Sequence, residues 1–483
     1  MLVELRRKLE PIGRLELLES VMLATRDYYL AQSDPGTDED QHRRAVALHG
    51  LGDVLAEKGD AAAALSEHRA ALAIHQRLAA RDPRWRASYA ASATAVGDAM
   101  PPAGESDGAL ATYRIGLALN EALVAERPDD AAALQQLATS YTSIGAFYFD
   151  HHRDVAGALV QRERALEIHR RLVALAPYDV GRTRDLVRSL AGVAELHLHR
   201  GDFERAAAMH REALTLVSTI AQADPTDAIS QSLLADCEEN LGGVFDNQGD
   251  GFAARELARS SLAIRERLIG QDPTNAAWRG DLARSEMKLG RALEKLGDLA
   301  GAAQHHRRAI QELDRLVSSH TTRLRMRSDH GIAERLLGQV LTRQGKIDLA
   351  IAALESSLAT AEAVAAEEPA NQRWLRELAF THTHLADARA QAGELGSALE
   401  HQRKALALAE QLAARDATNA SSQYELADRL MHLGELLVRH AEPEPARAAF
   451  KRALAIDDAL VAQAPSNKLW VERARTLRGR LAP

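Results

Sequence analysis

The sequence predicts an all-α superhelix built from helix pairs that repeat along the chain. Hydrophobic residues make up 46% of the 483 residues but aromatic residues only 4%, a composition typical of helices rich in Ala and Leu. One position recurs at spacings of 45, 49 and then 48 residues, and its occupants are Gly59, Gly104, Arg153, Gly201, Gly249, Gly297, Gly345, Gly393 and Ala441. A period this regular indicates an array of supersecondary units. We call the recurring residue the anchor and number the repeats one to nine.

Three positions in each repeat hold only small residues. The residue seven before the anchor is Gly or Ala, the residue five after it is always Ala, and the residue twelve after it is Ala, Ser or Gly. In repeat six these residues are Gly290, Ala302 and Ala309. Helices approach closely only where no large side chain intervenes, and a larger residue there would overpack the contact. We call the first helix of each repeat helix A and the second helix B. We therefore expect the first two positions to join helix A to helix B, and the third to join helix B to the next repeat.

Turn residues separate the expected helices at fixed places. In repeat six, Pro273 ends the preceding helix, Asn275 is a candidate N-cap for helix A, and Gly297 and Asp298 form the turn to helix B. This punctuation predicts helices of roughly 20 residues, about 30 Å long. All four tryptophans stand in the first turn of a helix A and are expected to be buried between repeats: Trp85, Trp278, Trp374 and Trp470.

The spacing of Gly290, Ala302 and Ala309 resembles the tetratricopeptide repeat, and it recurs from residue 38 to 465. The long period is similar to kinesin-light-chain-type repeats and to the tetratricopeptide arrays of large bacterial signalling proteins. The resemblance implies a right-handed solenoid with helix A on its concave side, where a protein or peptide would bind. The aromatic residue of the family's helix B survives only as Tyr113 and Phe450.

The domain organisation follows from this register. Residues 1–37 are expected to cap or connect the array, residues 38–465 to form nine repeats, and residues 466–483 to form a C-terminal capping helix. No stretch is left for a catalytic domain, so we expect no enzyme and no cofactor. The alternative is that the array is the regulatory arm of a bacterial signalling enzyme, with a kinase, nucleotide-binding switch or effector encoded upstream in the same polypeptide or operon.

Charge and cysteine content limit the expected partners and compartment. The net charge of −8 and a pI near 6.2 argue against nucleic-acid binding, which needs Lys and Arg to neutralise phosphates. A nucleic-acid-binding solenoid is therefore the weaker alternative. The single cysteine, Cys237, excludes an intramolecular disulfide and is compatible with a reducing compartment. No signal peptide or membrane span is expected, so we predict a cytoplasmic protein without a membrane partner.

Histidines occur in neighbouring pairs, but the sequence predicts no metal site. The pairs are 151/152, 197/199, 305/306 and 382/384. Histidines this close in sequence point to different faces of a helix, and no carboxylate or thiolate at a fixed spacing completes a ligand set. We expect His68, His210 and His306 to fill the aromatic position of helix B instead.

Charged residues on the expected concave wall form the main candidate site. Two interpretations remain open: ordinary solvated charges, or adjacent bands of opposite sign that select an extended peptide or a partner helix. The acidic band of repeat five contains Asp236, Glu239 and Asp246, and the mainly basic band of repeats six and seven contains Arg284, Arg291, Lys295, Arg335 and Arg343.

A second candidate is a cluster of aromatic residues in repeat three. Tyr141, Phe147, Tyr148 and Phe149 fall within nine residues of a chain poor in aromatics. Phe149 is expected in the core and Phe147 on the concave wall, with Tyr148 beside it. The cluster is either core packing or an aromatic pocket that anchors a partner.

Overall fold

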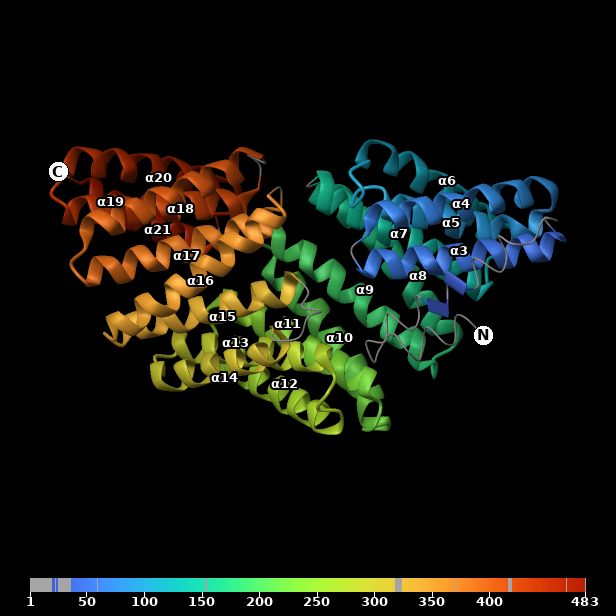
Figure 1. The fold of residues 1–483 in the computed structure, drawn as a ribbon, viewed down its shortest axis with the longest axis horizontal. Helices are drawn as coiled ribbons and strands as arrows, with labels where there is room; N and C mark the ends of the chain where they lie inside the picture. The colour runs from blue at the N-terminus through green and yellow to red at the C-terminus, as the bar shows by residue number, and fades with distance from the viewer. Residues whose placement is uncertain are drawn as a thin grey trace. The chain divides into compact units, whose positions relative to one another are not determined.

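The computed structural model describes Ser20, Val21, Leu23, Ala24 and residues 36–482, except for residues 59, 153, 318–323, 370, 416–418 and 466. The expected N-terminal cap over residues 1–37 thus lies almost wholly outside the described residues. Those described form helices and no strand (Figure 1). In chain order the elements are α3 (Asp38–Lys58), α4 (Ala61–Arg81), the short 3-10 helix η2 (Pro83–Trp85), α5 (Arg86–Ala99), α6 (Ser106–Glu126), α7 (Ala131–His152), α8 (Val155–Leu175), α9 (Val180–His199), α10 (Phe203–Ala223), α11 (Ala228–Gln248), α12 (Gly251–Gln271), α13 (Ala276–Lys295), α14 (Leu299–Val317), α15 (Leu324–Arg343), α16 (Ile347–Glu367), α17 (Gln372–Gln391), α18 (Leu395–Arg415), α19 (Ala420–Arg439), α20 (Pro443–Gln463) and α21 (Lys468–Leu481).

The helices belong to two compact units. The first covers residues 1–196 with 215–220, and the second covers residues 197–214 with 221–483. Within the first, α3 packs on α4, α5 on α6 and α7 on α8; within the second, each odd-numbered helix from α11 to α19 packs on the even-numbered helix that follows it. An odd-numbered helix is helix A of its repeat, and the even-numbered helix is helix B. The predicted all-α array of helix pairs is confirmed.

The anchor turns adopt the left-handed backbone conformation that the glycines favour. Gly249 and Gly297 have φ angles of 85° and 86°, and the next residue caps helix B: Asp298 accepts a hydrogen bond from the Gly301 amide at 2.8 Å. In repeat nine Ala441 makes the same turn with φ 64°, and it is the only non-glycine with positive φ among the described residues.

The turns between repeats also follow the predicted pattern. The Asn275 side chain accepts hydrogen bonds from the amides of Ala277 and Trp278 at 3.1 and 3.2 Å, which caps α13. Trp85 and Trp374 are buried against the core, as expected, whereas Trp278 and Trp470 are only partly buried. The indole of Trp374 donates to Glu368 Oε2 at 2.8 Å, so its polar atom is satisfied.

Close contact between helix A and helix B occurs at the predicted small residues. A Cβ atom added to Gly290 would lie 2.5 Å from the imidazole of His306, and one added to Gly338 would lie 2.5 Å from Leu354 Cγ. Gly52, Gly97 and Gly434 meet His68, Tyr113 and Phe450 in the same way. The side chain nine residues after the anchor therefore fills the space above the glycine seven residues before it. Histidine replaces the family's aromatic residue at this position in repeats one and six, as predicted.

Within the described part of the chain, one helix is long and apolar enough to cross a membrane by length and composition. It is α16, whose window has a mean hydropathy of 1.4 and is 28% buried. As helix B of repeat seven, α16 packs against both α15 and α17. Its exposed face consists mainly of Ala, Ser and Glu, with Leu349 as the one large apolar side chain more than half exposed. The short side chains that let α16 pack in the array thus explain its high mean hydropathy.

The glycine contact yields a prediction with a matched control. Gly290→Ala inserts a methyl group against His306 and should destabilise the fold by about 1–3 kcal/mol, offset only in part by the better helix propensity of alanine. Gly243 lies on α11 with no atom within 4 Å of an added Cβ, so Gly243→Ala should stabilise by up to about 1 kcal/mol. Urea unfolding followed by circular dichroism should show opposite shifts in midpoint. Shifts in the same direction would contradict the contact.

His306 makes stability depend on pH. It is fully buried, neither ring nitrogen has a hydrogen-bond partner among the described residues, and burial lowers its pKa to about 3 from an ordinary 6.5. Because the folded-state pKa is depressed, the unfolded chain takes up this proton first. Stability is therefore lost as the pH falls below about 6.5, by about 2 kcal/mol from this group at pH 5.

His306→Phe should remove this component. Phe450 already occupies the equivalent place over Gly434, so the ring fits. We expect the variant to melt at a higher temperature than the natural chain, by a margin that widens from pH 7 to pH 5. A margin independent of pH would show that His306 does not titrate in this range.

Candidate functional site

Helices A of the second compact unit lie along one another. α11 contacts α13, α13 contacts α15 and α15 contacts α17, whereas successive helices B do not approach to this extent among the described residues. The helices A therefore form the inner side of each turn of the array. We call the side of α11, α13, α15, α17 and α19 on which they face one another the A wall.

Ion pairs join each helix A of the A wall to the next. Lys295 of α13 pairs with Asp246 of α11 at 2.6 Å, and Arg343 of α15 pairs with Glu294 of α13 at 2.9 Å. Three more pairs of this kind are Lys288 with Glu239, Arg335 with Glu377 (3.1 Å) and Arg376 with Glu425 (2.9 Å). The acidic and basic bands predicted from the sequence thus adjoin, and most of their charges pair across the boundary between repeats.

A buried arginine organises the acidic band. Arg265 of α12 is 2% exposed; its guanidinium pairs with Asp236 and lies 2.6 Å from Ser232 Oγ and 3.5 Å from Asp281. Burial raises the pKa of Asp236, and Arg265 opposes that shift. The sequence prediction missed Arg265. Its signal was a charged residue at a helix B position, sixteen after the anchor, where other repeats hold buried polar residues such as His75, Asn120 and His169.

Glu239 is the most enclosed carboxylate of the predicted set. It is 9% exposed and accepts hydrogen bonds from Ser261 Oγ at 2.7 Å, from Ser285 and from Lys288. Burial alone would raise its pKa, but the charges of Lys288 and Arg265 prevail and lower it. Glu239 therefore stays ionised and ties α11 to both α12 and α13.

Two of the predicted arginines are also committed to contacts within the chain. Arg284 pairs with Asp281 and, at 3.3 Å, with Asp329 of α15. Arg335 is 8% exposed and lies over the ring of Phe380, 5.4 Å from its centroid. Arg429 lies 4.6 Å from the same ring. Phe380, which the sequence did not single out, is thus a shared cation–π partner of repeats seven and nine.

Arg291 is different from the other predicted cations. Its side chain is exposed and forms no hydrogen bond or ion pair within the described part of the chain. Gly243 holds the equivalent place on α11, 48 residues earlier; it is exposed and has open space where a side chain would stand. An exposed glycine on α11 and an exposed arginine without an ion-pair partner on α13 therefore occupy equivalent positions on neighbouring helices of the A wall.

The aromatic cluster of repeat three lies in the first compact unit and packs mainly into the core. Phe147 is 3% exposed and its ring centroid lies 5.7 Å from that of Tyr113. Its expected place on the concave wall is wrong, because the ring turns toward α6. Tyr148 packs half-buried against the same core cluster.

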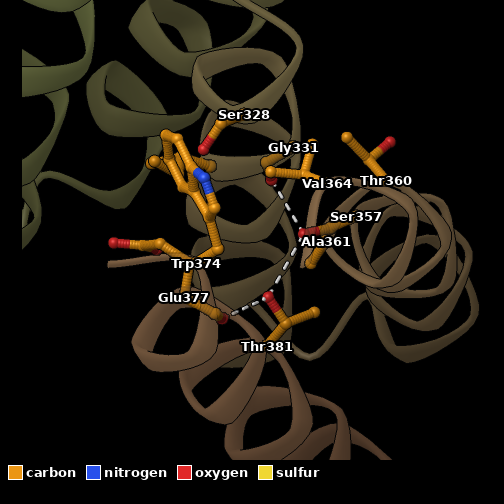
Figure 2. Close-up of a pocket in the computed structure, with 10 residues that line it drawn as sticks. Ser328, Gly331, Ser357, Thr360, Ala361, Val364, Trp374, Glu377 and Thr381 are labelled. Carbon is orange, nitrogen blue, oxygen red and sulfur yellow. Dashed lines mark hydrogen bonds between the residues drawn. The ribbon is translucent and has the colours of Figure 1, made fainter. Parts of the chain in front are cut away.

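A small hollow lies where α15, α16 and α17 meet (Figure 2). It encloses about 260 Å³, part of it open solvent, and is bounded by Gly331, Thr360, Ala361 and Trp374. In repeat nine the first three of these positions are Ala427, Ile456 and Asp457. The hydroxyls of Ser357 and Thr381 are already hydrogen-bonded within the chain. The hollow therefore forms because smaller side chains stand here than in repeat nine. Its volume is below that of typical ligand pockets, which is about 300–1,000 Å³.

In repeat one the structure brings together a carboxylate and two histidines that the sequence did not connect. They are His49 and Asp53 of α3 and His68 of α4. None of the neighbouring histidine pairs considered in the sequence belongs to this cluster. The three residues come from two helices, so their proximity follows from the pairing of the helices and not from spacing along one of them.

Comparison with known families identifies the repeat unit. Residues 234–275, which span most of α11 and all of α12, match the family model described as tetratricopeptide repeat. This helix pair is a tetratricopeptide repeat. The superfamily assignment made from Gly290, Ala302 and Ala309 is confirmed, with helices of 19 to 22 residues in most repeats.

Solved structures similar to this tetratricopeptide array have low sequence identity to it. BtubC (BKLC) from P. vanneervenii is 19% identical over 55% of this chain and 92% of its own, with a TM-score of 0.41. A Rap protein complexed with competence and sporulation factor is 14% identical over 87% of this chain and 99% of its own, with a TM-score of 0.49. The Rap conjugation gene regulator of plasmid pLS20, in complex with the Phr* peptide, is 11% identical over 85% and 98%, with a TM-score of 0.48. A search of curated proteins finds no match.

The Glu239 contacts predict that this carboxylate stabilises the tetratricopeptide array. Glu239→Gln removes the charge that compensates Arg265 and Lys288, and should destabilise the fold by about 2–3 kcal/mol. The control is Glu472→Gln, which breaks the exposed pair with Arg475 at 2.9 Å and should change stability by less than about 0.5 kcal/mol. Urea-unfolding midpoints measure both. Equal effects would show that the buried network contributes no more than a surface pair.

Proposed function

We propose that the chain is a non-catalytic scaffold, and that it binds a peptide or protein segment carrying a carboxylate on the A wall of repeats five and six. The observation that carries this proposal is that exposed Gly243 and exposed Arg291, which has no ion-pair partner among the described residues, hold equivalent positions on the neighbouring helices α11 and α13. A carboxylate placed at Arg291 would gain a charge-assisted hydrogen bond.

Gly243 supports a binding role because the fold does not need it. A glycine inside a helix is less stable than alanine by roughly 0.5–1 kcal/mol. The glycine of repeat six, Gly290, is required by the ring of His306, but an added Cβ at Gly243 would meet no atom within 4 Å. The open space lets the backbone of a bound segment approach α11 closely.

The remaining predicted residues would border the bound segment. Asp246 and Lys295 pair with each other beside Arg291. Arg343 continues the charged wall onto α15, where it pairs with Glu294 of α13. Asp236, Glu239, Arg284 and Arg335 hold the helices of the wall in place through their own pairs. We assign these four a positioning role, and we assign direct contact to Arg291.

A cytoplasmic location fits the chemistry of the single cysteine. Cys237 is 1% exposed, and burial raises the pKa of its thiol to about 12. Such a thiol is inert toward oxidation and toward partner cysteines. We therefore expect the scaffold to act without forming disulfides.

A single charge reversal tests the binding surface. Peptides are selected from a displayed random library on the full chain, and their affinities are measured by fluorescence polarisation. Arg291→Glu should weaken the selected acidic peptides at least tenfold, because it replaces an attraction with a repulsion. Helicity measured by circular dichroism should stay unchanged, since Arg291 forms no hydrogen bond or ion pair among the described residues.

Arg403→Glu is the matched control. Arg403 is exposed on α18, a helix B, and also forms no ion pair among the described residues. The substitution Arg403→Glu makes the same change in net charge at a site away from the A wall, so it should leave the affinity for the peptides unchanged. The proposal fails if both reversals weaken binding equally, or if Arg291→Glu binds like the natural chain.

A further inference from the structure

The three side chains that meet in repeat one have the composition of a metal-ligand set. His49 Nε2 lies 3.8 Å from Asp53 Oδ2, and His68 Nε2 lies 3.6 Å from Asp53 Oδ1. One ligand atom from each residue fits within 4.8 Å of the other two. His49 and Asp53 are four residues apart on α3 and so share one face of the helix, which is turned toward His68 of α4.

We propose that His49, Asp53 and His68 bind a divalent transition-metal ion of the Zn²⁺ type, which joins helix A to helix B in repeat one. Two imidazoles and one carboxylate are borderline ligands suited to Zn²⁺, Co²⁺ or Ni²⁺. Three protein ligands leave at least one coordination position for water.

The distances are close to those of a formed site. Zinc binds imidazole and carboxylate at about 2.0–2.2 Å, so ligand atoms around a tetrahedral ion lie roughly 3.3 Å apart. The two measured separations, which involve different oxygens of Asp53, exceed this by less than about 1 Å, and all three ligand atoms lie within 4.8 Å of one another. Rotation of the side chains can close the remaining distance. Gly52 makes the approach possible, because a Cβ there would lie 2.7 Å from the His68 imidazole.

The fold of the repeat does not require this combination. Repeat six has the same glycine–histidine contact between Gly290 and His306, yet Met287 and Arg291 stand at the positions of His49 and Asp53. The contact alone therefore explains one histidine but not the second histidine or the carboxylate. Repeat one is the only repeat whose sequence carries all three ligand types at these positions.

The surroundings allow an ion to enter. The His49 side chain is 34% exposed and that of Asp53 is 23% exposed, while His68 is 4% exposed. The two outer ligands can thus capture a hydrated ion, and the buried imidazole replaces one of its waters. The bound ion would favour the folded state, because the unfolded chain does not hold the three ligands together.

Titration of the full, tag-free chain with ZnCl₂ after chelator treatment tests the site. Isothermal calorimetry should show one equivalent of zinc bound, and thermal melting should shift upward with zinc. Co²⁺ should give visible d–d absorption of comparable stoichiometry. Asp53→Asn and His68→Phe should each lose this equivalent and the melting shift.

His306→Phe is the matched control, because it removes a histidine from the same position in a repeat that lacks the other two ligands. It should retain the zinc equivalent. The site is refuted if the natural chain binds no zinc, if Asp53→Asn still binds it, or if His306→Phe loses it as completely as His68→Phe. Phe450 over Gly434 shows that phenylalanine fits this position, and circular dichroism of each variant verifies that it folds.

Discussion

The array depends on one contact, the packing of a helix B side chain into the space left by a glycine on helix A. The contact is made by histidine over Gly52 and Gly290, by tyrosine over Gly97, by leucine over Gly338 and by phenylalanine over Gly434. The chemistry of the filling side chain varies over these five glycines, and in repeats three, four and eight alanine takes the place of the glycine. The helix distance in these five pairs is therefore set sterically, and their polar features are built on helices whose separation is already fixed.

The fixed separation places equivalent residues of successive helices A at constant steps, so charges 49 residues apart meet. Lys295 with Asp246 and Arg343 with Glu294 are two such meetings. The A wall is thus a surface whose charges largely cancel, and Arg291 stands out because it has no such partner. In repeat one the pairing of helix A with helix B brings His68 beside Asp53.

The sequence predicted the fold well because the residues that pack helices recur in every repeat, and repetition separates them from chance. The sequence alone was enough to assign the packing roles of Gly290 and Ala302 and the capping role of Asn275. Residues that occur once could not. Arg265 and Phe380 were missed because their partners lie on other helices, and Phe147 was placed on the wrong side because a helix face was read without the rotation of that helix. The non-repeating Arg291 was recognised, but its lack of a partner could be known only from the positions of its neighbours.

The ion pairs of the A wall have a consequence for selectivity. A carboxylate arriving at Lys295 competes with Asp246, which is held at 2.6 Å by the fold and so acts as a tethered competitor with a high effective concentration. The same holds for Arg343, where Glu294 is the resident carboxylate. Isolated acidic groups in solution would therefore bind weakly at both cations, and a ligand that engages several positions at once would compete better with Asp246 and Glu294. The wall would then discriminate by the arrangement of charges in a partner and not by the partner's total charge.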